Sequence, residues 1–398
     1  MKIASVRCVE YTGTLDHPEE FWEERLIRPV DIYPRFRSEG PPHLPRSGER
    51  SYRVESLFVH VEADSGVVGT AGPITREQAQ HILTSMAPLL LGQDPLATEQ
   101  RWDQLHRYCV HGRKGTEMMA ISALDCALWD LKGRHFDVPV HVLLGGPVRD
   151  EIPAYASALG YSLDPDRVRE RAAQLVGEGY TAMKWFPRHG PADGRGGMAK
   201  NEELVRTLRE TVGPDVDIMV DAWMSWDVPY TLRMAQRLVD YAPHWIEEPV
   251  QPDRIDSYAQ ITAQIDNRIM ITGGEHEYTR WGQHQLMRSR ALHLTQPDTY
   301  WAGGISELLK IAALASTYDV KLIPHGHSVP ANANLSFALP VALTPMLEYL
   351  VKWNALHQFF LAHPVHPVGG VVTPPTRPGL GMDLDEDKIE GRRELHPA

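Results

Sequence analysis

The stretch NEELVRTLRETVGPDVDIMVDA, residues 201–222, decides how the fold of this chain is interpreted. Its first half carries apolar residues at helical spacing, and Gly213 ends that pattern. The second half, DIMVDA, is a short apolar run typical of a buried strand, and it contains Asp221 near its end. A helix followed at once by a buried strand is half of a repeating unit in which parallel strands alternate with helices.

The same alternation extends over most of the chain. Short apolar runs begin 24 to 36 residues apart from about residue 150 onward, and most gaps between them hold an amphipathic helical stretch. Eight units at this spacing predict parallel strands closed into a barrel, and so the α/β fold class. The runs are 152–157, 181–186, 217–222, 244–249, 268–275, 292–298, 320–326 and 346–351.

The first third of the chain has a different pattern. Residues 1–14 and 53–70 predict strands, and 75–135 predicts helices, which together are typical of an α+β domain. The long Pro- and Arg-rich stretch 17–53 between the strands favours a functional loop. We therefore expect three parts: an α+β domain over 1–135, the barrel over 136–362, and a C-terminal segment, 363–398, that packs back on the first domain.

Charge and composition exclude several classes of partner. The formal net charge is −12 and no long basic run occurs, which argues against binding to nucleic acid or to an anionic membrane surface. No stretch of about 18 apolar residues and no signal peptide is visible. The three cysteines show no zinc-binding spacing, which favours a reduced, cytoplasmic protein.

Acidic residues end three consecutive predicted strands. Asp221, Glu247 and Glu275 would meet at the C-terminal rim of the barrel, where such folds carry their chemistry. Three converging carboxylates repel one another unless a cation lies between them, and hard oxygen ligands suit Mg²⁺. Ordinary ion pairs explain a single acid of this kind better than three in register. We therefore predict a magnesium site formed by these residues.

The next two strands bring a carboxylate beside an imidazole. Asp298 and His325 end neighbouring runs, and such a carboxylate fixes the tautomer of the ring and raises its basicity. His327 leaves a second interpretation open, an H-x-H zinc pair in a hydrolase. A third interpretation is a barrel that has lost catalysis and serves as a binding protein.

In this order the residues resemble the enolase superfamily, in its mandelate racemase-like branch. The match consists of Asp221, Glu247 in WIEEP, Glu275 in TGGEH, Asp298 in QPD and His325 in PHG. The helix ALDCALWDLKGR, followed by PVHVLLGG, resembles the end of that family's capping domain. The resemblance implies an N-terminal α+β capping domain, a modified TIM barrel of the form (β/α)₇β, and one Mg²⁺ per active site. The family removes a proton α to a carboxylate, and Mg²⁺ stabilises the enediolate that forms.

The resemblance also bears on the branch of chemistry. Family members that work on both faces of the substrate often carry Lys-x-Lys after the second strand; here Lys184 matches the first lysine and Phe186 replaces the second. This departure favours a dehydratase in which His325 removes the α-proton and returns it to a leaving β-hydroxyl, giving a 2-keto-3-deoxy acid. A racemase or epimerase with Lys184 as second base is the alternative. The segment GEHEYT is most similar to sugar-acid dehydratases of the L-rhamnonate type.

Further roles follow from the same resemblance. Lys184 would neutralise the substrate carboxylate, Glu348 would hydrogen-bond the developing oxyanion, and His276 would contact the substrate. The partner is then a small-molecule aldonate or aldarate, and a homo-oligomer is expected. Candidates for specificity contacts lie in the 17–53 loop and in the loop after the second strand: Tyr33, His43, Arg46, Arg53, Arg188 and His189.

Overall fold

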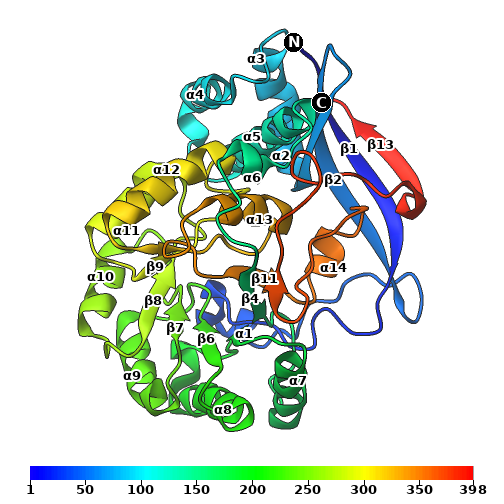
Figure 1. Cartoon of the computed structure of the whole chain (residues 1–398). Coiled ribbons are helices and arrows are strands. Elements are labelled where there is room, and N and C mark those ends of the chain that lie inside the picture. Colours follow the sequence, from blue (N-terminus) through cyan, green and yellow to red (C-terminus); the bar gives the residue numbers. More distant parts are fainter. Residues whose placement is uncertain (398) are drawn as a thin grey trace.

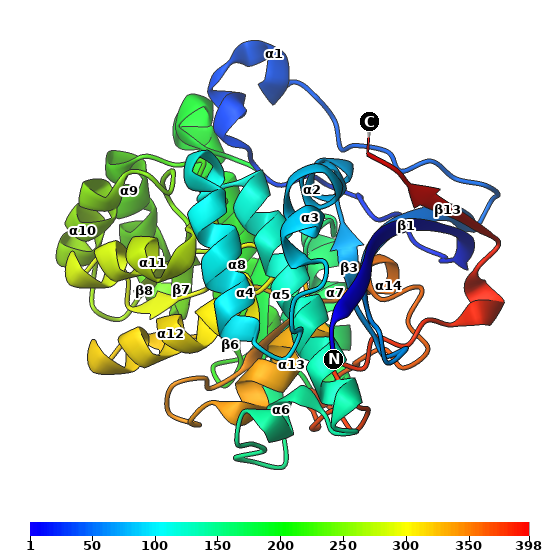
Figure 2. The same ribbon diagram turned by 90° about the horizontal axis from the view of Figure 1, so that it is seen from above.

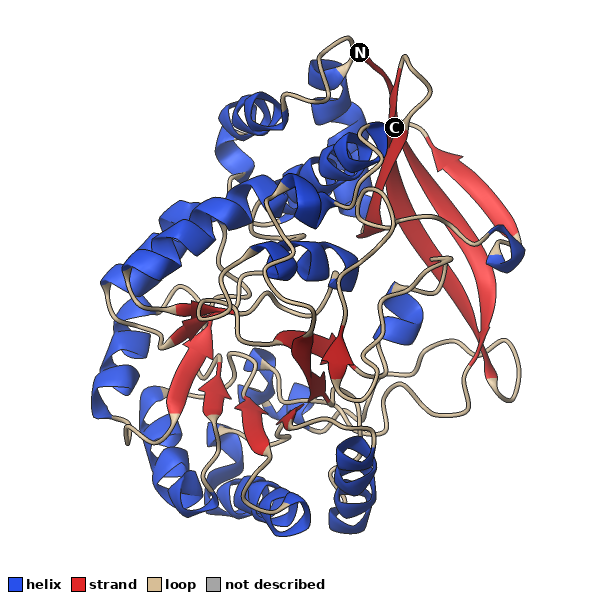
Figure 3. Cartoon of the chain, viewed as in Figure 1, coloured by secondary structure: helices blue, strands red, loops and turns tan. Residues whose placement is uncertain are grey.

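An antiparallel sheet lies beside a curved parallel sheet in this chain (Figure 1). The computed structural model describes residues 1–397. The two sheets differ in their connections. A long loop, one hairpin turn and the C-terminal end of the chain connect the strands of the first, whereas helices separate the strands of the second, as Figure 3 shows by colour. The predicted α/β class with an N-terminal capping sheet is confirmed.

The antiparallel sheet has the strand order β13-β1-β2-β3. Its longest strands, β1 (Ile3–Asp16) and β2 (Ser51–Ala63), are paired along almost their whole length. The turn Asp-Ser-Gly leads from β2 into β3 (Val68–Ile74), with Gly66 at φ +85°, a conformation that favours glycine. The last strand, β13 (Gly391–Leu395), pairs antiparallel with β1, so the C-terminal segment lies against the N-terminal sheet.

Helices cover one face of this sheet. The longest, α5 (Thr116–His135), is buried on most of its surface, because it packs on β3 on one side and on α12 (Gly304–Thr317) of the barrel on the other. Its Asp125 accepts hydrogen bonds from the backbone N–H and the hydroxyl of Ser306 at the start of α12, at 2.9 and 2.6 Å. The helices of this layer, seen from above in Figure 2, are α2 (Arg76–His81), α3 (Ala87–Leu90), α4 (Thr98–Tyr108) and α5 (Thr116–His135), with a π-helical turn over Ile82–Met86.

Each of the eight predicted runs contains one strand of the parallel sheet. The spatial order is β10-β9-β8-β7-β6-β5-β4-β11, so the first and eighth strands are neighbours. No pairing joins β10 to β11 within residues 1–397, which leaves the hydrogen-bonded path open there. The strands are β4 (Ile152–Ser157), β5 (Ala182–Trp185), β6 (Asp217–Asp221), β7 (Trp245–Glu247), β8 (Met270–Gly273), β9 (Leu294–Thr295), β10 (Lys321–Leu322) and β11 (Leu347–Leu350).

Seven helices connect these strands, as the (β/α)₇β form requires. Short elements precede and follow the strands: α6 (Val140–Leu143), α14 (Asn354–His357) and β12 (Val371–Val372), which pairs antiparallel with β4. The connecting helices are α7 (Pro165–Gly177), α8 (Gly194–Val212), α9 (Val228–Leu238), α10 (Ile255–Gln264), α11 (Thr279–Arg288), α12 (Gly304–Thr317) and α13 (Val329–Ala338).

Strand alternation determines which side chains fill the barrel. Large residues such as Met219 and Trp245 pack together inside it, whereas Val220 and Ile246 lie in the cluster that contains the surrounding helices. Because successive residues point to opposite faces, Asp221 shares the inward face with Met219, and Glu247 shares it with Trp245. Asp221 and Glu247 are also register partners in β6 and β7. The barrel core therefore continues at its C-terminal end into a polar layer.

The 17–53 loop is tied to the barrel rim beside β11. The ammonium of Lys352 bonds the Glu20 carbonyl at 2.7 Å and forms an ion pair with Glu23, and the rings of Phe21 and Trp353 lie 5.4 Å apart. The loop contains a 3₁₀ turn (Pro29–Ile32) and α1 (Pro34–Arg37), which projects from the body of the molecule in Figure 2. These contacts place the first part of the loop over the C-terminal ends of the strands.

Two further observations concern the cysteines and the helices. Cys8, Cys109 and Cys126 are buried free thiols. Within residues 1–397, every helix is too short or too polar to cross a membrane.

Candidate active site

A cavity of about 610 Å³ opens at the C-terminal ends of the parallel strands. Charged groups from β5, β6 and the loops after β8 and β10 meet there with aromatic side chains from the loops. The charged and imidazole groups of its lining are Arg25, Arg28, Glu39, Lys184, Asp221, Glu275, His325, His327 and His357. The apolar part consists of Trp22, Leu26, Gly40, Pro42, Leu159, Phe186, Trp223, Trp301, Leu350 and Trp353.

Lys184 on β5 is the centre of a buried cluster of carboxylates. Its ammonium lies 2.6 Å from Glu247, 2.8 Å from Glu348 and 3.1 Å from Asp221. The other oxygen of Glu247 accepts hydrogen bonds from the indole of Trp245, at 3.0 Å, and from the amide of Gln296, at 2.8 Å. Both oxygens of Glu247 are therefore held, one by a cation and one by neutral donors.

Burial and mutual repulsion act on the carboxylates of this rim. Burial raises the pKa of Asp221, and the charges of Glu275 and Glu248 raise it further against the effect of Lys184. Burial likewise raises the pKa of Glu247, with Asp221 adding to the shift. Glu348 differs, because Lys184 and His325 outweigh its burial and lower its pKa. The rim thus concentrates more negative charge than Lys184 alone balances.

His325 is oriented by a carboxylate on the neighbouring strand end. Its Nδ1 lies 2.7 Å from Oδ2 of Asp298, and its Nε2 lies 3.4 Å from Oε1 of Glu275. Burial disfavours the charged ring, but Glu275, the Asp298 hydrogen bond and Glu348 outweigh it and raise the pKa of His325 to about 10. Because Asp298 accepts from Nδ1, the Nε2 atom is the one left to exchange protons with a bound molecule.

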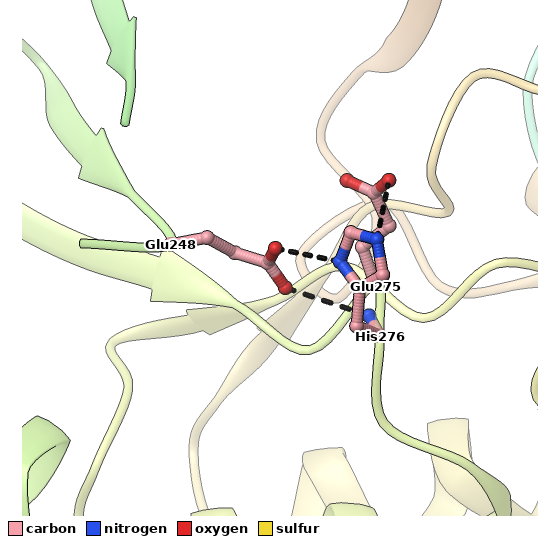
Figure 4. Close-up of side chains that lie close together, drawn as sticks. All are labelled: Glu248, Glu275 and His276. Carbon is pink, nitrogen blue, oxygen red and sulfur yellow. Dashed lines mark hydrogen bonds and ion pairs between the residues drawn. The ribbon is translucent and has the colours of Figure 1, made fainter. Parts of the chain in front are cut away.

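Glu275 owes its position to the two glycines before it. Gly274 has φ +98°, where a side chain would be strained, and an added Cβ there would lie 2.8 Å from the Thr295 hydroxyl. Figure 4 shows the result: the imidazole of His276 lies between the carboxylates of Glu275 and of Glu248, which follows β7. His276 Nδ1 lies 2.7 Å from Glu248, and its Nε2 lies 3.8 Å from Glu275.

These three residues form a candidate metal site. One ligand atom from each of Glu248, Glu275 and His276 lies within 4.8 Å of the others. Among the described residues, the carboxylates of the predicted trio, Asp221, Glu247 and Glu275, do not all lie this close to one another. The physical reason is that Lys184 draws Asp221 and Glu247 toward itself, whereas Glu275 lies nearer to His276 and His325.

Glu275 lines the cavity, but His276 is absent from the described lining. Burial disfavours a charged His276, yet Glu248 and Glu275 raise its pKa to about 9. In this arrangement His276 is a cation that holds two carboxylates, rather than a residue facing the substrate space. Its predicted substrate contact therefore stays a prediction.

The predicted specificity residues lie away from the cavity. Tyr33 and His43 are exposed, and Arg46 forms an ion pair with Glu20 at 2.6 Å. Arg53 pairs with Glu55 at 3.1 Å and lines a second, adjacent cavity. This placement differs from the expectation, because Arg53 lies in β2 rather than in the loop and nearby carboxylates pair with both arginines.

Other residues of the same loop reach the cavity instead. Trp22, Arg25, Leu26 and Arg28 line it, and Arg25 is held by a bidentate pair with the buried Asp31, at 2.5 and 3.2 Å. The stretch FWEERLIRP, residues 21–29, combines aromatic, aliphatic and basic residues before a proline, but no spacing rule says which turn of a loop faces inward.

Three other polar residues, Glu277, Arg188 and His189, lie outside the lining of the main cavity. Glu277 is buried and pairs with Lys114 of the capping domain at 2.5 Å. Arg188 donates to the carbonyl of Arg37 at 2.8 Å, and with His189 it lines a separate small cavity. These contacts tie loops together outside the main cavity.

Removing the Lys184 charge will destabilise the protein. In metal-free buffer we expect Lys184→Met to lower the free energy of unfolding by about 3 kcal/mol, because three buried carboxylates lose their cation. Urea denaturation measures this. The matched control is Lys200→Met at an exposed position of α8, for which we expect a change within about 0.5 kcal/mol. Equal urea midpoints for Lys184→Met and wild type would refute the role of this cluster.

Known proteins of one family are similar to this chain in sequence and in fold. Residues 167–388 match the enolase C-terminal domain-like family, and residues 38–145 match the mandelate racemase/muconate lactonizing enzyme N-terminal domain. An L-rhamnonate dehydratase of Saccharopolyspora erythraea is 35% identical over 99% of each chain. Two solved structures are also similar. Rhamnonate dehydratase from Gibberella zeae complexed with Mg has a TM-score of 0.82 and 30% identity, covering 97% of this chain and 95% of that one. A racemase from Streptomyces coelicolor with bound magnesium has a TM-score of 0.79 and 27% identity, covering 97% and 98%.

Proposed function

The chain belongs to the mandelate racemase/muconate lactonizing enzyme group of the enolase superfamily, and from that membership we propose that it dehydrates an acid sugar. The observation that carries the proposal is the Asp298–His325 pair at a cavity that Lys184 also lines. It provides one oriented base, and Phe186 stands where a second base would be needed for work on both faces. The relatives that act on L-rhamnonate make a 6-deoxy aldonate the first substrate to test.

We propose that Asp221, Glu247 and Glu275 hold one Mg²⁺ ion. All three are buried carboxylates from consecutive strand ends, and oxygen donors of this kind suit Mg²⁺. Burial, with repulsion from neighbouring carboxylates, raises the pKa of Asp221 and Glu247, and an added cation would relieve both effects. When bound, the ion would stabilise the negative oxygens that develop as the α-proton leaves. The cluster of Glu248, Glu275 and His276 includes a nitrogen ligand and fits Mg²⁺ less well.

The residues of the chain then have distinct tasks in the reaction. His325 removes the proton α to the carboxylate through Nε2, and Asp298 holds the imidazolium that results. Lys184 would neutralise the substrate carboxylate, and Glu348, 2.8 Å from the Lys184 ammonium, would hydrogen-bond the developing oxyanion. The C–O bond at the β-carbon then breaks, and His325 gives its proton to the departing hydroxyl, which leaves as water. The enol that remains tautomerises to the 2-keto-3-deoxy acid.

Epimerisation is the second candidate, because the similar racemase has the same fold. In the alternative, Lys184 would return a proton to the opposite face. Lys184 already forms ion pairs with three carboxylates, and Phe186 occupies the position of the second lysine that catalysts working on both faces carry. This favours dehydration.

A screen of aldonic and aldaric acids tests the proposal directly. In buffered D₂O with Mg²⁺ we expect at least one acid to yield a 2-keto-3-deoxy product, detected by proton NMR. Deuterium at the α-position of recovered substrate, accumulation of the epimer and no keto acid would show epimerisation instead. No turnover of any acid would contradict both.

A further inference from the structure

Two histidines outside the proposed catalytic set lie in contact with each other in the wall of the cavity. His327 follows β10 and His357 ends α14, and their ring centroids lie 4.7 Å apart. Both rings line the cavity, and His327 also packs on Trp301 at 5.6 Å. The Nδ1 atom of each ring is buried without a hydrogen-bond partner among residues 1–397. Buried polar atoms are normally satisfied, so this pair has hydrogen-bonding capacity that the chain itself does not use.

Both rings are uncharged at neutral pH. Burial, with the neighbouring charge of the other histidines, lowers the pKa of His327 to about 3 and that of His357 to about 4. A neutral imidazole has one donor and one acceptor nitrogen, and a hydroxyl group likewise donates and accepts. The pair is therefore suited to a hydroxyl and poorly suited to a carboxylate.

The cavity also offers no spare positive charge for a second carboxylate. Three guanidinium or ammonium groups lie in the described lining, and each already bonds carboxylates. Arg25 bonds Asp31, and Arg28 bonds Asp31 and Glu39 at 3.0 and 2.9 Å. Lys184 bonds its three acids. A charged distal end would have to enter without a free cation to receive it.

The position of the pair suits the far end of a substrate held by His325. In Pro-His-Gly-His, residues 324–327, His325 and His327 are two positions apart, so their Cα atoms are separated by at most about 7 Å. A six-carbon acid extends over a comparable length beyond its α-carbon. Beyond the pair lies the second cavity, of about 500 Å³, which shares Trp301, His327, Trp353 and His357 with the first. His327 and His357 thus lie at the boundary between the cavity that contains His325 and the second cavity.

We propose that His327 and His357 together bind a hydroxyl group at the uncharged distal end of the acid sugar, and so select aldonic over aldaric acids. This inference rests on the proposed dehydratase function. The two histidines are specificity residues in it, because they contact the substrate away from the reacting carbons.

Kinetics with matched substrates test the inference. The substrates are the best aldonate from the screen, its analogues lacking one distal hydroxyl each, and the corresponding aldarate. For His357→Phe we expect kcat/KM on the parent acid to fall about tenfold or more, mainly through KM. On the analogue that lacks the contacted hydroxyl, the loss should stay below about threefold. His357→Gln keeps a donor and an acceptor and should recover part of the affinity.

The control is His284→Phe, a change on the outer helix α11, where His284 bonds the Tyr318 hydroxyl at 2.9 Å. We expect wild-type kinetics on all substrates for this variant. If His357→Phe loses kcat/KM equally on the parent acid and on every analogue, the inference is overturned. It is also overturned if His357→Phe keeps the wild-type kcat/KM on the parent acid, or if the wild-type enzyme prefers the aldarate. If wild type dehydrates no acid at all, the proposed function itself fails, which is a different result.

Discussion

His325→Asn should reduce turnover by about 10⁴-fold, the upper end of what a single acid–base group contributes. The expectation is this large because one imidazole both removes the α-proton and protonates the leaving hydroxyl. Asparagine is close in shape but cannot take up a proton at neutral pH. Deuterium exchange at the α-position in D₂O should disappear together with keto-acid formation.

Two measurements separate this effect from misfolding. The urea midpoint and the binding of the substrate, measured by calorimetry on the variant, should stay near wild type, because the cavity keeps its walls. His43→Asn is the matched control, since His43 is exposed outside the described lining, and it should keep full activity if the placement seen here is right. If His325→Asn still exchanges the α-proton at the wild-type rate, another group is the base.

Glu275→Gln should abolish most activity and weaken Mg²⁺ binding by about 100-fold. Glu275 lies near both His325, at 3.4 Å, and the Glu248–His276 pair, so it is a member of either metal arrangement. An amide of the same size keeps the volume and removes the charge that binds a divalent cation. Isothermal titration with Mg²⁺ measures the affinity independently of turnover. Unchanged Mg²⁺ affinity would refute the metal role of Glu275.

Two companion variants decide which carboxylates share the ion with Glu275. If the ion is held by the proposed trio, Asp221→Asn should weaken Mg²⁺ binding about as much as Glu275→Gln does, and Glu248→Gln should weaken it less. The opposite order would place the metal at Glu248, Glu275 and His276. Both outcomes are read from the same titration.

The fold could be predicted from the sequence because its signals are local. Each parallel strand is a short apolar run, and each run lies within the predicted span, as with β6 at Asp217–Asp221 inside 217–222. Strands buried by helices on one side and by the barrel core on the other need such runs, and the helices between them need one apolar face. These requirements act within about ten residues of chain, so they are visible without coordinates.

Some contacts between the charged residues at the C-terminal rim of the barrel could also be predicted from the sequence. Residues that follow neighbouring parallel strands gather at the same rim, so Asp298 after β9 and His325 after β10 could be expected to lie close together, and their side chains are 2.7 Å apart. Position in the chain does not say which partner each side chain contacts. Lys184 forms ion pairs with Asp221 and Glu247, and His276 forms one with Glu248.

The sequence by itself therefore determined the fold, the family and the set of acids and bases at one rim, because these follow from periodic patterns and ordered motifs. Only the tertiary structure decided which residues close the cavity. Trp22 and Arg28 replace the expected Arg46 and Arg53, and His357 meets His327 from another element. The path of a long loop, and the meeting of residues 30 positions apart, depend on packing between elements that no local pattern encodes.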